Sequence, residues 1–302
     1  GAVSGTSISF GTPVVFETAA TYFPGIAYDT NAQKVVIAYT DNGNSNYGTA
    51  IVGTVSGTDI SFGTAVVYES ATAYYNNVAY DANAQKVVIV YQDAGNANYG
   101  TSIVGTVSGT SISFGTAVIF EGANTYEPRA VYDSTAQKVI ITYTDNGNSI
   151  YGTAIVGSIS GTSISFGSPT VFDAVTVADQ WSAYDSTNNK IVIAYRNNDL
   201  NNYGRAVVGT VSGTSISFGT PVVFNNTGST TEIAVTHDTY SGKTVISYKD
   251  AGNSNYGTAI VGTVSGTGAT GTISFTSPTV FESANTNYIA ATFDTANNTT
   301  AI

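Results

Sequence analysis

The chain has no cysteine and no methionine among its 302 residues, so disulfide bonds and thiolate metal sites are excluded. It also has little charge, since Asp, Glu, Lys and Arg make up 10% of the residues, against roughly 25% in ordinary soluble domains. The net charge of −11 at pH 7 argues against nucleic acid or an anionic membrane as a partner, because both require a basic surface. The longest apolar runs, such as residues 35–38, are far too short to insert into a bilayer.

What the chain does contain is a long internal repeat. The segment 27–69, AYDTNAQKVVIAYTDNGNSNYGTAIVGTVSGTDISFGTAVVYE, returns with small changes along the whole sequence. Its SISF phenylalanine recurs every 52 residues, with one longer insertion before the last copy, at Phe10, Phe62, Phe114, Phe166, Phe218 and Phe275. A period of this length is typical of repeat architectures.

One repeat predicts four β-strands separated by turns. In the first copy we expect strands at 22–28, 34–40, 47–56 and 60–69, with a bulge or bend at Gly63. The second of these lacks clean apolar–polar alternation, which indicates burial on both faces. No segment shows the apolar spacing and caps of a helix. Four antiparallel strands repeated about six times predict an all-β, six-bladed β-propeller.

The propeller is expected to be a single domain over residues 1–302. Its blades would cover approximately 22–69, 74–121, 126–173, 178–225 and 231–282, with a sixth formed by 287–302 together with 1–17. Pairing between the two ends would then close the ring. An open β-solenoid, or a larger ring of which this is a fragment, is the alternative. Because the chain begins and ends inside a repeat, we expect it to be a piece of a longer product.

The repeat resembles two kinds of known protein. VSGTSISFGTPVVF is similar to the strand–turn–strand of Asp-box (BNR) sialidase-type propellers, although most copies lack the internal aspartate and Phe62 or Phe114 replaces the usual Trp. The complete units, with YDxxxQKVVIAY and YGTAIVGTVSG, resemble those of virion structural and tail-associated proteins of marine phages of the cyanophage type. That resemblance covers nearly the whole chain. It implies a location on the virion surface or outside the cell, and a role in host adhesion.

Two features constant between repeats are interpreted as scaffold. Lys34, Lys86, Lys138, Lys190 and Lys243 each lie five residues after the YD aspartate, which predicts an exposed Asp–Lys pair across a turn. The DNGNSN turn places oxygen ligands at alternate positions, which would suit Ca²⁺. Each loop has only one carboxylate, however, so a turn without a metal is the main interpretation and no cofactor is expected. The turns concerned begin at Asp41, Asp93, Asp145 and Asp250.

Variation between the repeats is concentrated just before the YD pair, at the entry to the first strand. Six triplets occupy this position, and they contain the only tryptophan, one of three arginines and three acids. Loops held by a rigid scaffold are where binding sites tend to lie. The candidate ligand-binding residues are Phe23, Tyr75, Asn77, Glu127, Arg129, Asp179, Gln180, Trp181, Glu232 and Tyr288. Drift at an unconstrained rim is the alternative explanation.

The function predicted from these observations is a non-catalytic module that binds a host cell-surface glycan or other virion proteins. A sialidase-like glycoside hydrolase is an alternative, with Glu127, Asp179 and Glu232 as conceivable carboxylates. Against it, only Arg129, Arg196 and Arg205 could hold a substrate carboxylate, and the sole histidine, His237, replaces a scaffold tyrosine. We therefore expect that the chain is not an enzyme, with no catalytic residue and no metal site. A decoration domain without a ligand is the remaining alternative.

Overall fold

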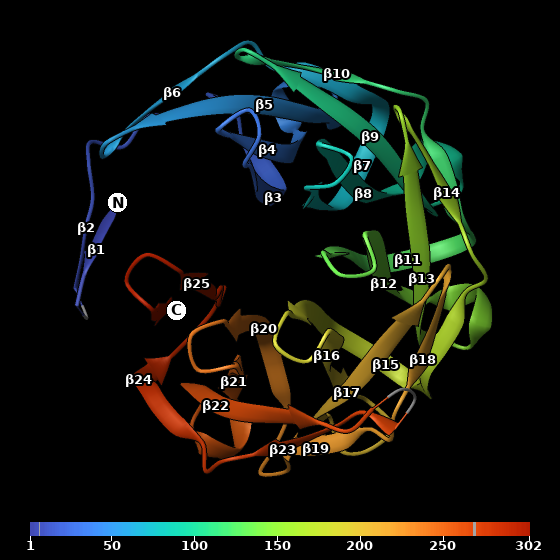
Figure 1. Cartoon of the computed structure of the whole chain (residues 1–302), viewed down its shortest axis with the longest axis vertical. Helices are drawn as coiled ribbons and strands as arrows, with labels where there is room; N and C mark the ends of the chain where they lie inside the picture. The colour runs from blue at the N-terminus through green and yellow to red at the C-terminus, as the bar shows by residue number, and fades with distance from the viewer. Residues whose placement is uncertain (6, 268–269) are drawn as a thin grey trace. The chain divides into compact units, whose positions relative to one another are not determined.

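The computed structural model describes residues 1–5, 7–267 and 270–302, and almost all of its regular structure is antiparallel β-sheet (Figure 1). The Cα positions divide into two compact units, each described here by itself. Unit 1 comprises residues 1–141, 145–147 and 157–167, and unit 2 comprises residues 142–144, 148–156 and 168–302. Among the described residues, no helix has the length and apolar character needed to cross a bilayer.

The four predicted strands are present, with two differences. The first strands are β3 (Thr21–Asp29), the second halves of β7 (Val66–Asp81), β11 (Val118–Asp133) and β15 (Thr170–Asp185), and β20 (Thr230–Asp238). The second strands are β4 (Lys34–Asp41), β8 (Lys86–Asp93), β12 (Lys138–Asp145), β16 (Lys190–Asn197) and β21 (Lys243–Asp250). The third strands are β5 (Tyr47–Ser56), β9 (Tyr99–Ser108), β13 (Tyr151–Ser160), β17 (Tyr203–Ser212) and β22 (Tyr256–Ser265).

The first difference is that the fourth strand is broken at the glycine where a bend was predicted. Its first parts are β6 (Asp59–Phe62), β10 (Ser111–Phe114), β14 (Ser163–Phe166), β18 (Ser215–Phe218) and β23 (Thr272–Phe275). Its second parts are the first halves of β7, β11 and β15, together with β19 (Val222–Asn225) and β24 (Thr279–Asn285). Thus β7 pairs with β5 as the fourth strand of one sheet, then with β8 as the first strand of the next.

The second difference is a short 3-10 turn between the second and third strands. These turns are η1 (Asn42–Asn44), η2 (Ala94–Asn96), η3 (Asn146–Asn148) and η4 (Ala251–Asn253). Asp41 caps η1, because its side chain accepts hydrogen bonds from the Gly43 and Asn44 amides at 2.9 and 3.2 Å. The sequence predicted a turn here but not its 3-10 form, because a single turn of three residues leaves no apolar periodicity.

At the two ends of the chain, short strands pair locally. In unit 1, β1 (Ala2–Ser4) pairs with β2 (Ser7–Ser9), and in unit 2, β25 (Thr292–Asp294) pairs with β26 (Thr299–Ala301). The prediction that both ends share a sixth blade, like the single-domain ring itself, remains a prediction.

Burial on both faces of the second strand is confirmed. Val87, Val88, Ile89, Val90 and Tyr91 of β8 have no exposed surface. In unit 1, side chains of β4 and β5 pack against those of β8 and β9 in one apolar cluster, so one sheet covers the face of the next. A single four-stranded sheet would leave both apolar faces in water, which is why the repeats stabilise one another.

The YD aspartate has a different role from the one predicted. Asp29 is buried, and its Oδ1 accepts hydrogen bonds from the Asn31 and Ala32 amides at 2.9 and 2.8 Å. Among the described residues, no ion pair joins Asp29 to Lys34. The Tyr80 hydroxyl of the following repeat accepts a hydrogen bond from the Asn31 amide at 3.3 Å, so this turn also links successive sheets. The expected Asp–Lys pair is therefore wrong, and the aspartate is retained as a turn cap.

A carboxylate on the fourth strand faces the buried tyrosine of the second strand. The Tyr91 hydroxyl donates to Glu69 Oε2 at 3.0 Å, and in the preceding repeat the Tyr39 hydroxyl donates to Glu17 Oε2 at 3.4 Å. Burial, and then the nearby Asp93 carboxylate, raise the pKa of Glu69. A hydrogen bond from the Ala19 amide is the main cause that lowers the pKa of Glu17. The equivalent residues Glu17 and Glu69 are thus expected to change the pH dependence of folding stability in opposite directions.

This difference predicts opposite results for two matched substitutions. A group with a raised folded-state pKa contributes stability below its unfolded-state pKa and loses that contribution as the pH rises through the folded-state value. Glu69→Gln is therefore expected to unfold at a higher temperature than the wild type at neutral pH, with the gain disappearing at about pH 4. Glu17→Gln is expected to unfold at a lower temperature at neutral pH. Circular dichroism melting measures both, and a lower melting temperature for Glu69→Gln at neutral pH would contradict the expectation.

Candidate functional site

In four repeats the variable triplet coincides with a β-bulge in the first strand. In β3 the pairing moves from Tyr22 with Thr40 to Gly25 with Ala38, so that Phe23 and Pro24 stand opposite the single residue Tyr39. The same register shift occurs in β7, β15 and β20. An extra residue in one strand bends that strand and redirects a side chain, which is a common arrangement beside functional sites.

The first residue of every triplet has a left-handed backbone conformation although none is glycine. These six are called the bulge residues: Phe23 (φ 50°), Tyr75 (54°), Glu127 (50°), Asp179 (50°), Glu232 (53°) and Tyr288 (59°). For a residue with a Cβ this conformation costs roughly 1–2 kcal/mol. Backbone strain retained at one equivalent position, where the side chains differ most, is an indication of function.

The bulge also separates the predicted site residues by direction. In four of the six triplets the second residue is buried, as shown by Gln180, which is 1% exposed, and by Asn76, whose side chain accepts from the Tyr68 hydroxyl at 2.5 Å; Pro24 of the first triplet is exposed. Trp181 is half-buried and packs against the apolar cluster that contains Val192. Gln180 and Trp181 therefore belong to the interior side of the bulge, whereas the bulge residues are half-buried or exposed.

In unit 1 the bulge residues and their neighbours contact one another between repeats. The rings of Phe23 and Tyr75 have centroids 4.9 Å apart. Burial and the nearby Glu127 carboxylate raise the pKa of Tyr75, whereas the Arg129 guanidinium opposes this. Asn77 Oδ1 accepts a hydrogen bond from the Ala130 amide at 2.9 Å, which ties β7 to β11. Five of the predicted residues are thus brought together: Phe23, Tyr75, Asn77, Glu127 and Arg129.

In unit 2 the bulge residues are acids and an exposed tyrosine. Asp179 Oδ2 lies 2.7 Å from Nη1 of Arg196 on the neighbouring strand β16. Glu232 Oε2 accepts a hydrogen bond from the backbone amide of Tyr288 at 3.0 Å. The Tyr288 side chain is 92% exposed. Because β15 and β20 are in contact, the bulges that carry Asp179 and Glu232 belong to adjacent strands.

One position of the second strand also belongs to the site, and the sequence analysis missed it. Its side chains reach the bulge region: Gln92 donates to Asn124 at 2.8 Å, Lys249 donates to Asn287 at 2.8 Å, and Arg196 pairs with Asp179. The equivalent residues are Thr40, Gln92, Thr144, Arg196 and Lys249. The signal was present in the sequence, because this is a variable polar residue inside an otherwise constant strand, directly before the turn Asp or Asn.

The site has no evident metal centre among the described residues, where no group of three or more His, Asp or Glu side chains could hold an ion. The turn aspartates named as calcium candidates are engaged locally. Asp93 and Asp250 each accept a hydrogen bond from a turn glycine amide, at 2.9 and 3.0 Å. A turn without a metal stays the prediction here, with calcium binding as its alternative.

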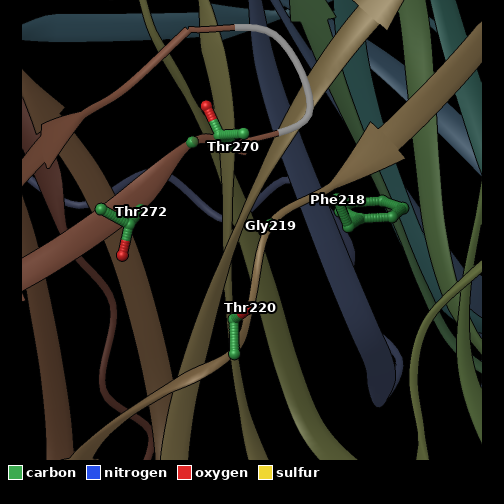
Figure 2. A pocket seen from close by; sticks show the side chains of 6 residues that line it. Phe218, Gly219, Thr220, Thr270 and Thr272 are labelled. Carbon is green, nitrogen blue, oxygen red and sulfur yellow. The ribbon is translucent and has the colours of Figure 1, made fainter.

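A hollow of about 350 Å³ lies elsewhere, on the outer strands of unit 2. Figure 2 shows it between the end of β18, at Phe218 to Thr220, and the start of β23, at Thr270 to Thr272. The residues lining it are Phe218, Gly219, Thr220, Thr270, Gly271 and Thr272, none of which is charged or titratable. The hollow therefore has no group for acid–base chemistry, and none of the bulge residues lines it.

Comparison with known proteins supports the fold. No family model and no curated protein matches the sequence. A protein of unknown function from Dyadobacter fermentans aligns over 90% of this chain and 86% of its own, with TM-score 0.59 and 11% identity. The leech intramolecular trans-sialidase, solved with 2,7-anhydro-Neu5Ac, aligns over 96% of this chain and 65% of its own, with TM-score 0.57 and 10% identity. A triple arginine-to-alanine mutant of AofleA from Arthrobotrys oligospora aligns over 92% of this chain and 78% of its own, with TM-score 0.56 and 9% identity.

These similarities confirm an all-β fold of the sialidase-type propeller kind, but not the number of blades. They also correct the prediction that the chain is not an enzyme. The leech protein and the NanB sialidase of Streptococcus pneumoniae, which aligns with TM-score 0.53 and 8% identity over 77% of this chain and 53% of its own, share the fold and are named as sialidases. The fold thus points to a possible enzyme, and the sialidase-like alternative is better supported than the main prediction. None of the structures named here is a phage protein.

Proposed function

We propose that this protein acts on glycans as a sialidase-like glycoside hydrolase, with its site at the bulge residues. The observation that carries the proposal is the coincidence of two features at one position. Near-identical repeats differ most at the residues where each described repeat keeps a non-glycine residue in a left-handed conformation. Drift at an unconstrained rim would not retain a conformation that costs roughly 1–2 kcal/mol in each repeat.

The cations support the same location. Of the nine Lys and Arg residues, five occupy the constant position after the YD pair. Of the other four, Arg129 follows a bulge residue, and Arg196 and Lys249 occupy the variable position of the second strand. In a chain with so few cations, the two at the variable position of unit 2, Arg196 and Lys249, favour recognition of a polar, hydroxyl-rich or acidic ligand there.

The chemistry is assigned to unit 2, where two carboxylates are carried by bulges on adjacent strands. In most glycoside hydrolases one carboxyl group protonates the leaving oxygen and a second group assists water or the sugar cation on the other face. Asp179 and Glu232 are the candidates for these two roles. Arg196 orients Asp179 at 2.7 Å and supplies its counter-charge. Tyr288, exposed beside Glu232, is available to contact the sugar.

The test is turnover of a panel of 4-methylumbelliferyl glycosides, including the α-N-acetylneuraminide, by the complete chain. Asp179→Asn and Glu232→Gln are each expected to lower kcat/KM by about 100-fold or more, because each removes a group that transfers a proton or stabilises charge. Glu282→Gln is the control, since it removes an exposed acid of unit 2 that lies on β24. Absence of turnover on the whole panel, or unchanged turnover in both site variants, would rule out the proposed reaction.

We also propose that the glycan is displayed on a cell surface, and that the chain is located outside the cell or on a virion. The support for this is the resemblance of the repeat units to virion proteins of marine phages.

A further inference from the structure

Unit 1 carries aromatic side chains where unit 2 carries acids. Around the bulges of β3, β7 and β11 lie five rings, which are called the aromatic platform: Tyr22, Phe23, Tyr74, Tyr75 and Tyr126. At the equivalent positions of β15 and β20, unit 2 has Ala178, Asp179, Thr231 and Glu232. The repeats thus differ in the kind of contact they can offer.

The rings of the platform are continuous from one repeat to the next. The Phe23 ring lies 5.9 Å from that of Tyr74 and 4.9 Å from that of Tyr75, centroid to centroid. The Tyr75 ring lies 6.5 Å from that of Tyr126 in the third repeat. These distances are within the range in which aromatic rings interact directly. Three successive repeats therefore support one connected surface.

This surface faces solvent, although it is made of large aromatic side chains. Tyr22, Phe23 and Tyr74 are 50%, 40% and 37% exposed. The backbones of Phe23 and Tyr75, which position these two rings, have left-handed conformations. A connected apolar patch on a protein surface is usually a site of interaction. The strain at these two residues adds to the cost of keeping the patch open.

The charges beside the platform indicate what kind of ligand fits. Glu127 and Arg129 lie two residues apart at the bulge of β11, so opposite charges of equal size stand at the end of the platform. Neither an anionic nor a cationic polymer gains from this balance. Sugars present apolar C–H faces to rings and hydroxyl groups to neighbouring polar side chains, which matches rings flanked by tyrosine hydroxyls, a carboxylate and a guanidinium.

We propose that the aromatic platform binds a neutral glycan chain by stacking of its sugar rings on Phe23, Tyr75 and their neighbours. The inference rests on the proposed function in that it assigns a glycan as the ligand, and it adds that an uncharged stretch of that glycan binds to unit 1. The platform requires no reaction at Asp179 or Glu232.

Isothermal titration of the complete chain with cellohexaose, laminarihexaose and xylohexaose tests the proposal, with a galacturonate hexamer as the acidic comparator. At least one neutral hexasaccharide is expected to bind. Phe23→Ala and Tyr75→Ala are each expected to weaken its Kd about tenfold, which corresponds to the loss of about 1.4 kcal/mol of stacking on one ring. Tyr75→Phe keeps the ring and is expected to stay within about twofold. Tyr240→Ala removes a tyrosine that is 75% exposed in a turn of unit 2, and this variant is expected to bind as the wild type does.

Three results would overturn the platform: no binding of any neutral hexasaccharide at millimolar concentration, equal Kd values in the wild type and both alanine variants, or tighter binding of the galacturonate hexamer than of every neutral one. Failure of the hydrolysis proposal is distinguishable. Loss of neutral-glycan binding in Phe23→Ala, together with no turnover by the wild type, would support the platform and contradict the hydrolysis proposal. Turnover that is lost in Asp179→Asn, together with glycan binding that is unchanged in Phe23→Ala and Tyr75→Ala, would support the hydrolysis proposal and contradict the platform.

Discussion

Replacing Gly63 by alanine is expected to lower the free energy of unfolding by about 3 kcal/mol, at the upper end of the usual cost of overpacking. A Cβ at Gly63 would lie 1.9 Å from the carbonyl oxygen of Thr110 in the next repeat. Because the Gly63 amide donates to Val52 O at 2.9 Å, the glycine is fixed in place and its neighbour would have to move. That neighbour is backbone in the hairpin between β9 and β10, which cannot yield as a flexible side chain would.

The same close approach recurs where the fourth strand breaks. A Cβ would lie 2.2 Å from Thr58 O at Gly11, 2.0 Å from Thr162 O at Gly115, and 1.8 Å from Gly271 O at Gly219. The broken fourth strand of one repeat therefore receives the hairpin tip of the next. Glycine is required here by the space available, since no positive φ accompanies these positions.

Urea unfolding of Gly63→Ala and of Gly122→Ala measures this effect with a matched control. Gly122 lies in β11 with no atom within 4 Å of a built Cβ, so its substitution is expected to be neutral or slightly stabilising. An unfolding midpoint for Gly63→Ala equal to that of the wild type would show that the contact between Gly63 and Thr110 can widen without loss of stability.

Replacing Arg205 by threonine is expected to destabilise the protein by about 2 kcal/mol or more, because it leaves a buried carboxylate without its cation. Nη1 of Arg205 lies 2.7 Å from Asp173 Oδ2, and both side chains are largely buried. The Tyr195 hydroxyl donates to the same oxygen at 2.6 Å. The other described repeats have threonine at the position of Arg205, namely Thr49, Thr101, Thr153 and Thr258. The substitution therefore introduces the residue type of those repeats without their surroundings.

A second substitution separates charge from packing. Asp173→Asn in the Arg205→Thr background is expected to recover most of the lost stability, since it removes the uncompensated charge. Arg196→Thr breaks a more exposed ion pair and is expected to cost under about 1 kcal/mol. Thermal unfolding followed by circular dichroism compares three variants with the wild type: Arg205→Thr, Arg205→Thr with Asp173→Asn, and Arg196→Thr. If Arg205→Thr costs no more than Arg196→Thr, burial of the pair has no energetic consequence.

The sequence alone determined the repeat and most of its strand bounds. A 52-residue period with turn residues between Val- and Ile-rich runs places strands locally, because side-chain alternation and turn chemistry act over a few residues. The third strand was predicted at 47–56 and is observed as Tyr47–Ser56. The variable triplets were also found from the sequence, because near-identical repeats make a difference visible without any other protein.

Only the tertiary structure decided which of those residues are exposed and which are buried. The bulge turns Asp179 outward and Gln180 inward, and a one-residue shift of register cannot be read from a triplet. Pairing of Arg196 with Asp179, and of Arg205 with Asp173, depends on which strands lie next to each other. From the sequence, the YD aspartates could equally have paired with lysine or capped a turn. In the structure Asp29 caps the turn, because it accepts hydrogen bonds from two backbone amides at 2.9 and 2.8 Å. Such choices depend on neighbours distant in the sequence, so the amino-acid pattern of one repeat leaves them open.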